Sequence, residues 1–154
     1  MKLDAQRTEK FEEVIRELYA TDPELIDKYH VLAPTDFESA VKDTVEAFKT
    51  EQRLSNFEMW EIREAGKLVA YFGISYLLKM SLMTGYFVLP QYRNSEFFPK
   101  FFSIIKSKMP RTWFTAPYKK NTRAIKFLKK NNFVEDGQIF IQEKGENALI
   151  FKYN

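Results

Sequence analysis

The first third of the chain has apolar residues at the spacing of amphipathic helices. Residues 7–20, RTEKFEEVIRELYA, place five of them on one face: Phe11, Val14, Ile15, Leu18 and Tyr19. Residues 35–52, TDFESAVKDTVEAFKTEQ, repeat this pattern with Phe37, Val41, Val45 and Phe48. The pattern predicts a mainly helical first third in which each helix buries one face.

From residue 57 the period changes to that of β-strands. Residues 57–64, FEMWEIRE, alternate between apolar and polar, and residues 65–67, AGK, have the composition of a turn. Residues 68–77, LVAYFGISYL, are apolar, β-branched and aromatic, as in a central strand. A third strand within residues 82–89 ends at Pro90, because proline cannot donate to a sheet ladder.

The second half alternates between the two periods. We expect helices over residues 99–109 and 121–133, a short strand over 111–116, and two strands within 133–153 joined near Lys144 and Gly145. No internal repeat or low-complexity linker interrupts the pattern. We therefore expect one α/β (α+β) domain over residues 1–154.

Composition excludes several classes of protein. Without cysteine, the chain cannot form a disulfide framework, a thiolate zinc site or a cysteine nucleophile. One histidine and no series of Asp or Asn residues at ligand spacing lead us to expect no metal, and hydrolase motifs are missing. The charged, periodic first residues and the short apolar runs favour a soluble, cytoplasmic protein with no membrane partner.

Basic residues are concentrated in the second half of the chain, although the formal net charge of the whole chain is only +3. Residues 118–130, YKKNTRAIKFLKK, carry six basic residues and no acidic one. This cluster is either a solvated helix face or an anion site. This charge balance argues against a nucleic-acid partner. A platform for single-stranded nucleic acid around Trp113 and Phe114 is a weaker alternative, because only one of these two side chains can face outward.

A candidate anion site lies where the strand before Pro90 passes through PQYRNSEF (90–97) into a helix. The first N–H groups of a helix have no partner within the helix, and its dipole favours an anion, so this crossing is a candidate diphosphate cradle. Arg93 adds a charged fork, and four nearby basic residues can meet further phosphates: Lys119, Lys120, Arg123 and Lys126.

This crossing and the helix NTRAIKFLKKNNF (121–133) together resemble the GCN5-related N-acetyltransferase (GNAT) family over roughly residues 57–153. In that family the helix reads Asn, two residues, Ala, two residues, Phe-Tyr, a charged pair and a final Gly-Phe. The chain has matching residues at Asn121, Ala124, Phe127, Lys129, Lys130 and Phe133. Asn121 can cap the helix, and Asn132 stands where the family has glycine, in a left-handed exit that Asn tolerates.

The resemblance implies a mixed, mostly antiparallel twisted sheet flanked by helices, and direct transfer of an acetyl group from acetyl-coenzyme A to an amine. The chain is similar to a divergent branch of this family that is often found in bacterial viruses. The implied cofactor-binding residues follow the third strand and open the two later helices: Phe87, Val88, Leu89, Arg93, Asn94, Ser95, Glu96, Phe97, Phe98, Asn121 and Arg123. The strand backbone near Phe87 to Leu89 would polarise the thioester carbonyl.

Two positions depart from the family pattern. Leu128 replaces the tyrosine that commonly protonates the departing thiolate, and Tyr118 is the candidate substitute. Glu96 and Phe98 occupy the glycine positions of the phosphate loop, where side chains hinder backbone approach. These departures favour the alternative that the chain is an inactive binding or structural module.

Deprotonation of the acceptor amine requires a base on the substrate side. Glu61 and Glu64 lie on a strand expected to border that side, and strand alternation puts them on opposite faces of the sheet. The sequence therefore leaves Glu61 and Tyr118 as the catalytic candidates, each with an ordinary structural role as its alternative.

Overall fold

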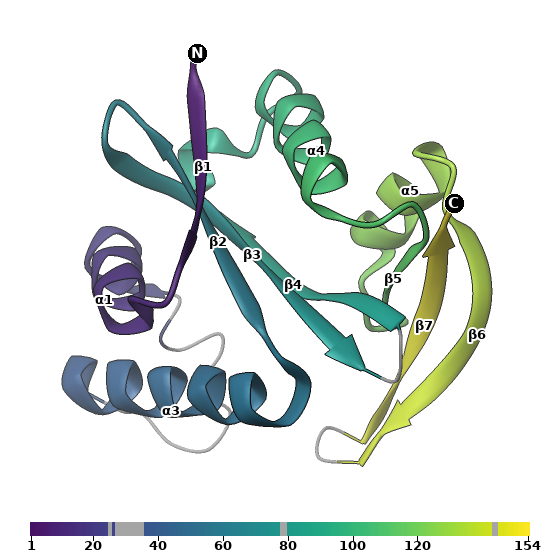
Figure 1. The fold of residues 1–154 in the computed structure, drawn as a ribbon, viewed down its shortest axis with the longest axis horizontal. Coiled ribbons are helices and arrows are strands. Elements are labelled where there is room, and N and C mark those ends of the chain that lie inside the picture. Colours follow the sequence, from purple (N-terminus) through teal and green to yellow (C-terminus); the bar gives the residue numbers. More distant parts are fainter. Residues whose placement is uncertain (25, 27–35, 78–79, 143–144) are drawn as a thin grey trace.

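The computed structural model describes residues 1–24, 26, 36–77, 80–142 and 145–154 (Figure 1). Within these residues the strands form one seven-stranded sheet in the order β1-β2-β3-β4-β5-β7-β6. Their bounds are Leu3–Thr8 (β1), Glu58–Glu64 (β2), Lys67–Leu77 (β3), Met80–Val88 (β4), Trp113–Thr115 (β5), Val134–Ile141 (β6) and Glu146–Tyr153 (β7). Neighbouring strands are antiparallel except β4 and β5, which are parallel.

Helices cover both faces of this sheet. Helices α1 (Phe11–Thr21) and α3 (Phe37–Ser55) pack on one face, and α4 (Phe97–Lys108) and α5 (Thr122–Lys130) pack on the other (Figure 1). A core cluster lies on each face of the sheet, and the side chains of β2 alternate between the two clusters. Met59 belongs to the α1/α3 core, and Ile62 belongs to the α4/α5 core. A short 3-10 helix, η1 (Pro90–Tyr92), joins β4 to α4. None of the helices in the described ranges is long and apolar enough to span a membrane.

The first third is less helical than the apolar pattern predicts. The five stripe residues of α1 are buried as expected, but residues 3–8 form strand β1, which pairs along β2 from Leu3 opposite Glu64 to Thr8 opposite Met59. An edge strand is solvated on one side and buries few side chains, so its sequence LDAQRT lacks a strong apolar signal.

The turns and helix starts follow from local chemistry. Ala65 and Gly66 both have positive φ, as a two-residue hairpin turn between β2 and β3 requires. Helix α3 starts at Phe37 because the carboxylate of Asp36 accepts a hydrogen bond from the backbone N–H of Ser39 at 2.8 Å. That hydrogen bond lowers the pKa of Asp36. The chain leaves α3 through Asn56 in the left-handed conformation and enters β2.

Candidate active site

Strand β4 separates from β5 halfway along its length. The two strands pair only at Leu82 with Phe114 and at Met83 with Thr115. After Thr115 the chain follows β7, with hydrogen bonds from Lys119 N to Asn147 O and from Leu149 N to Pro117 O, both at 2.9 Å. From Thr84 to Val88, β4 therefore has β3 on one side and, among the described residues, no paired strand on the other. We call this stretch, with the facing residues 116–118, the β4 opening.

A β-bulge at Thr84 accounts for the separation. Gly73 of β3 pairs with Gly85 while Ile74 pairs with Met83, so Thr84 is an extra residue on β4. Such an insertion bends its strand and increases the local twist. Residues Thr84, Gly85 and Tyr86 are exposed, and a Cβ built on Gly85 would meet no heavy atom within 4 Å. The side chains around the bulge thus leave room beside the strand.

Peptide groups of β4 alternate between its two edges. The N–H of Leu89 donates to Val69 O at 2.9 Å, so the peptide groups of Leu89 and Phe87 face β3. Those of Tyr86 and Val88 consequently face the opening. The carbonyl of Val88 accepts a hydrogen bond there from Nε of Arg93 at 2.8 Å. Of the three strand residues expected near the thioester, Val88 is the one whose backbone faces the open edge.

The start of α4 lies directly after this edge, and Asn94 closes it. The side-chain oxygen of Asn94 accepts hydrogen bonds from the backbone N–H groups of Glu96 at 3.1 Å and Phe97 at 2.9 Å. Two neighbouring donors thus converge on a single oxygen, which is the geometry that an anion at a helix start requires. The side-chain amide of Asn94 occupies this position.

The two large residues at the expected glycine positions are engaged elsewhere. The side chain of Glu96 is 71% exposed and forms an ion pair with Lys100 at 3.2 Å. Phe98 is half-buried and contacts Phe97, Phe101 and Phe127 in the aromatic layer between α4 and α5. Both side chains therefore have partners within α4 and α5. The guanidinium of Arg93 lies 5.3 Å from the ring centre of Phe87.

Helix α5 forms with the caps that the sequence predicts. Asn121 is its N-cap and accepts a hydrogen bond from Ala124 N at 3.2 Å, and Asn132 has a φ of 67°. The N–H of Phe133 donates to Leu128 O at 3.1 Å, which completes a Schellman motif. Leu128 is 5% exposed and belongs to the core beneath α4 and α5. At this position the chain has a packing residue and no proton donor.

The structure does not bring the two catalytic candidates together. Tyr118 lies on the far arm of the opening, where it forms a β-bridge with Ala148 of β7 and is half-buried. Glu61 lies on β2, and strands β3 and β4 separate it from that arm. Glu61 is 5% exposed, and its carboxylate accepts hydrogen bonds from Gln6 and from Arg63, the latter at 3.2 Å.

Glu61 and Glu64 of β2 face opposite sides of the sheet, as alternation predicts. Arg63, which binds Glu61, also reaches Glu17 of α1 at 3.0 Å, whereas Glu64 accepts a hydrogen bond from the hydroxyl of Tyr92 at 2.8 Å. That hydrogen bond and partial burial raise the pKa of Tyr92.

The basic cluster of residues 118–130 is partly neutralised. Lys120 forms an ion pair with Glu146 at 2.9 Å, and Lys129 forms one with Glu135 at 3.7 Å. Arg123 and Lys126 are exposed on α5 and have no ion pair within the described ranges.

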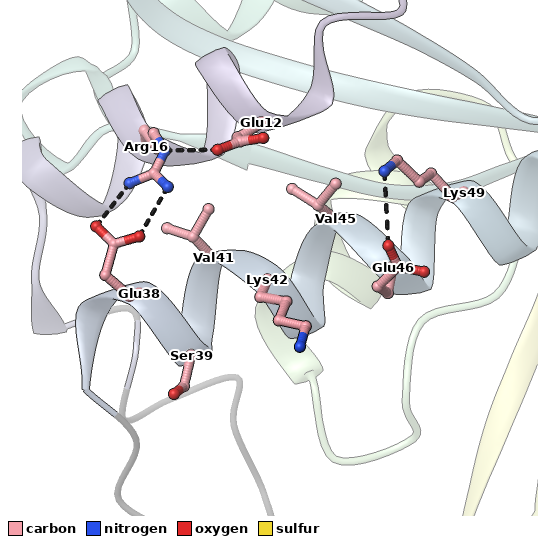
Figure 2. A pocket seen from close by; sticks show the side chains of 9 residues that line it. All are labelled: Glu12, Arg16, Glu38, Ser39, Val41, Lys42, Val45, Glu46 and Lys49. Atoms are coloured by element: carbon pink, nitrogen blue, oxygen red, sulfur yellow. Dashed lines mark hydrogen bonds and ion pairs between the residues drawn. The ribbon is translucent and has the colours of Figure 1, made fainter.

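Two surface hollows lie away from the β4 opening. One, of about 380 Å³, lies between α1 and α3, where Arg16 binds Glu38 and Glu12 (Figure 2). These hydrogen bonds raise the pKa of Arg16, and the hydrogen bond to Glu38 has the larger effect. The other, of about 560 Å³, lies between β1 and α1 and includes Glu61 and Arg63. Side chains that line each hollow form ion pairs with one another.

Comparison by sequence finds no match for the chain among known families or curated proteins. Comparison by structure matches it over nearly its whole length. A GNAT-family acetyltransferase from Bacillus cereus has a TM-score of 0.65 at 12% identity, covering 100% of this chain and 98% of the other. The PaiA N-acetyltransferase of Thermoplasma acidophilum, solved in complex with coenzyme A, has a TM-score of 0.63 at 12% identity and coverages of 100% and 99%. A mutant of the spermidine N-acetyltransferase SpeG from Vibrio cholerae has a TM-score of 0.68 at 11% identity and coverages of 97% and 92%.

Proposed function

We propose that this chain, which has the fold of the GNAT acetyltransferases, is an N-acyltransferase that moves the acetyl group of acetyl-coenzyme A directly to an amine. The observation that carries the proposal is the β4 opening, an unpaired strand edge that runs into the start of α4. The edge and the helix start together offer donors for both parts of the cofactor.

The pantetheine arm of coenzyme A is an extended chain with two amide groups. Such a chain can pair with a free strand edge as an added strand does. The peptide groups of Tyr86 and Val88 face the edge where it would lie. A backbone N–H on this edge would also stabilise the negative charge that develops on the thioester oxygen during attack.

The diphosphate would then reach the start of α4. The N–H groups of Glu96 and Phe97 can donate to it once the amide of Asn94 moves aside. Arg93 lies at the same mouth, and Asn121 and Arg123 lie at the start of α5 on the other side. In this proposal Ser95 and Phe98 shape the mouth, while Phe87 and Leu89 hold β4 against the α1/α3 core.

Transfer requires a neutral amine to attack the thioester carbon. A C–N bond forms as the C–S bond breaks, the amine loses a proton, and coenzyme A leaves as a thiolate that is then protonated. Tyr118, on the far arm of the opening, is the proposed donor of that proton. Glu61 shares a row with Tyr71 and Phe87 and lies about 10 Å from the β4 backbone, so water would carry any proton that it accepts.

The second candidate function is a binding module that has kept the fold without catalysis. Two observations favour it. Leu128 fills the position of the usual proton donor, and the side chain of Asn94 accepts hydrogen bonds from the N–H groups that would bind the diphosphate. Affinity for acetyl-coenzyme A separates the two functions, because an inactive module has no need of the cofactor.

Calorimetric titration with acetyl-coenzyme A, followed by a thiol-release assay, tests the proposal. The assay would use spermidine and a short peptide with a free N-terminus as acceptors. We expect binding at micromolar cofactor and thiol release that depends on the amine. No heat of binding at about 1 mM acetyl-coenzyme A would exclude the transferase and favour the module.

A further inference from the structure

The β4 opening has its free space on the α1/α3 side of the sheet. A Cβ on Gly73 would point at the ring of Phe57, which belongs to the α1/α3 core, and Gly85 is the cross-strand partner of Gly73 on the same face. A Cβ on Gly85 meets nothing within 4 Å. The next residue, Tyr86, points to the other side and contacts Phe101 of α4 at 5.8 Å. An acceptor therefore has room to approach the bulge from the α3 side.

Helix α3 presents one carboxylate toward this region. An oxygen of Glu51 accepts a hydrogen bond at 2.7 Å from the hydroxyl of Ser75, a fully buried residue of β3. Ser75 pairs with Leu82, and Leu82 pairs with Phe114, so the three form one row at the level where β4 and β5 are still joined. Ser75 lies two residues beyond Gly73, which is about 7 Å along the strand. The Glu51 carboxylate is thus held near the end of the β4 opening where β4 pairs with β5, on the α1/α3 face of the sheet.

Among the described residues, no basic side chain balances the charge of Glu51. Glu51 is half-buried, and no Lys or Arg within the described ranges forms an ion pair with it. Seven other carboxylates on α1, α3 and β2 have a basic partner within 4 Å: Glu12, Glu13, Glu17, Glu38, Glu46, Glu58 and Glu61. Of those on these elements without an ion pair, Asp43 is exposed, and Glu64 lies on the opposite face of the sheet, where it accepts a hydrogen bond from Tyr92. A partly desolvated carboxylate without a counter-ion attracts a cation, and its place near the C-terminal end of α3 strengthens that attraction.

We propose that Glu51 binds the amine of the acceptor, with Ser75 as the residue that positions its carboxylate. The acceptor class is then an aliphatic amine that is cationic in solution, held by a charge-assisted hydrogen bond beside the bulge. This inference rests on the proposed acetyl transfer and adds the residue that selects its substrate. An alcohol or other neutral acceptor would gain nothing from this carboxylate.

Kinetics of four variants test the assignment, with spermidine and the free-N-terminus peptide as probes. Glu51→Gln keeps the shape of the side chain and removes its charge, so we expect the KM for the amine to rise about tenfold or more. Glu51→Asp keeps the charge one methylene farther back and should lie between. Ser75→Ala should raise the KM less than Glu51→Gln does, because the carboxylate remains but is less well oriented.

Glu46→Gln is the matched control, because Glu46 lies on the same helix but is 57% exposed and pairs with Lys49. It should leave the KM unchanged, and all four variants should bind acetyl-coenzyme A within about twofold of the parent chain. Equal KM values in Glu51→Gln and Glu46→Gln would overturn the assignment.

Calorimetry with spermidine alone separates this inference from the proposed function. It should give an affinity that falls about tenfold in Glu51→Gln whether or not acetyl-coenzyme A is turned over. If the chain binds acetyl-coenzyme A but its affinity for spermidine is the same in Glu51→Gln, the role of Glu51 would be excluded while the proposed transferase activity would remain. Failure of the parent chain to bind either amine probe would overturn the inference as well.

Discussion

At the scale of single residues, Asn94 bears directly on the proposed cofactor binding. Its side-chain oxygen holds the N–H groups of Glu96 and Phe97, which the proposed diphosphate also needs. Asn94 therefore stabilises the start of α4 and would compete with the proposed diphosphate for these donors. Changes at Asn94 should affect stability and affinity in opposite directions.

Asn94→Asp tests this competition with almost no change in shape. A carboxylate caps the helix start at least as well as the amide, because it also interacts with the helix dipole, so the thermal midpoint should be unchanged or higher. The same charge repels the diphosphate, and we expect the Kd for acetyl-coenzyme A to rise about tenfold by calorimetry. Asn94→Ser, a shorter neutral cap, is the control, and an unchanged Kd in Asn94→Asp would argue against a diphosphate at this helix start.

Asn132 determines how α5 ends. Its φ of 67° lies in the left-handed region, which Asn tolerates and most residues with a Cβ do not. Asn132→Ala should lower the free energy of unfolding in urea by about 1 kcal/mol, whereas Asn132→Gly should leave it nearly unchanged. Equal losses in both variants would mean that the side-chain amide, and not the backbone conformation, is what matters at this position.

At the scale of elements, two glycines face each other beside the bulge on β4. A Cβ on Gly73 would lie 2.3 Å from the ring of Phe57, whereas a Cβ on Gly85 enters open space. Gly73→Ala should therefore destabilise the chain by about 1–3 kcal/mol in denaturant unfolding through overpacking. Gly85→Ala should change stability by less than about 0.5 kcal/mol. A Gly85→Ala variant as unstable as Gly73→Ala would show that the space beside the bulge is filled.

Helix α1 is joined to the sheet through a carboxylate that titrates. Burial alone would raise the pKa of Glu17, but hydrogen bonds from Arg63 and from the N–H of Leu68 lower it below its ordinary value. A lowered folded-state pKa adds stability above the unfolded pKa, and this stability is lost as the pH falls through the folded-state value.

Glu17→Gln resembles the protonated form of this group. We expect a lower thermal midpoint than that of the parent chain at pH 7, and a difference that shrinks as the pH falls from about 5 to 3. A difference that stays constant over this range would mean that the charge of Glu17 has no part in the acid response.

Elements with strong local signals could be predicted from the sequence, and elements defined by packing could not. The ends of α5 follow from Asn121 and Asn132, and the strands between residues 58 and 88 follow from their apolar runs. Strand β1 was wrongly placed in a helical region, because an edge strand buries few of its side chains.

The candidate site likewise has parts that could be predicted from the sequence and parts that could not. Its mouth could be located because a strand, a proline and a helix follow one another along the chain. The extra residue at Thr84 could not, because a bulge is a property of pairing between strands. The proposed role of Glu51 could not be predicted from the sequence, because only the packing of α3 on β3 brings its carboxylate to Ser75.

At the scale of the whole molecule, the sheet consists of two sections joined by a short parallel contact. Strands β1 to β4 with α1 and α3 lie on one side, and β5 to β7 with α5 lie on the other (Figure 1). Two register pairs, Leu82 with Phe114 and Met83 with Thr115, connect them, and beyond those pairs the sheet opens. The proposed cofactor site is the consequence of this divergence, since continuous pairing of β4 with β5 would leave no free edge on β4 for an extended ligand.

Amide chemical shifts measured during titration with acetyl-coenzyme A test this account most directly. We predict the largest changes at the N–H groups of Tyr86, Val88, Glu96 and Phe97, with smaller ones at the start of α5. Saturation with no change at these amides, or changes confined to the hollow between α1 and α3, would contradict the proposal that the β4 opening receives the cofactor.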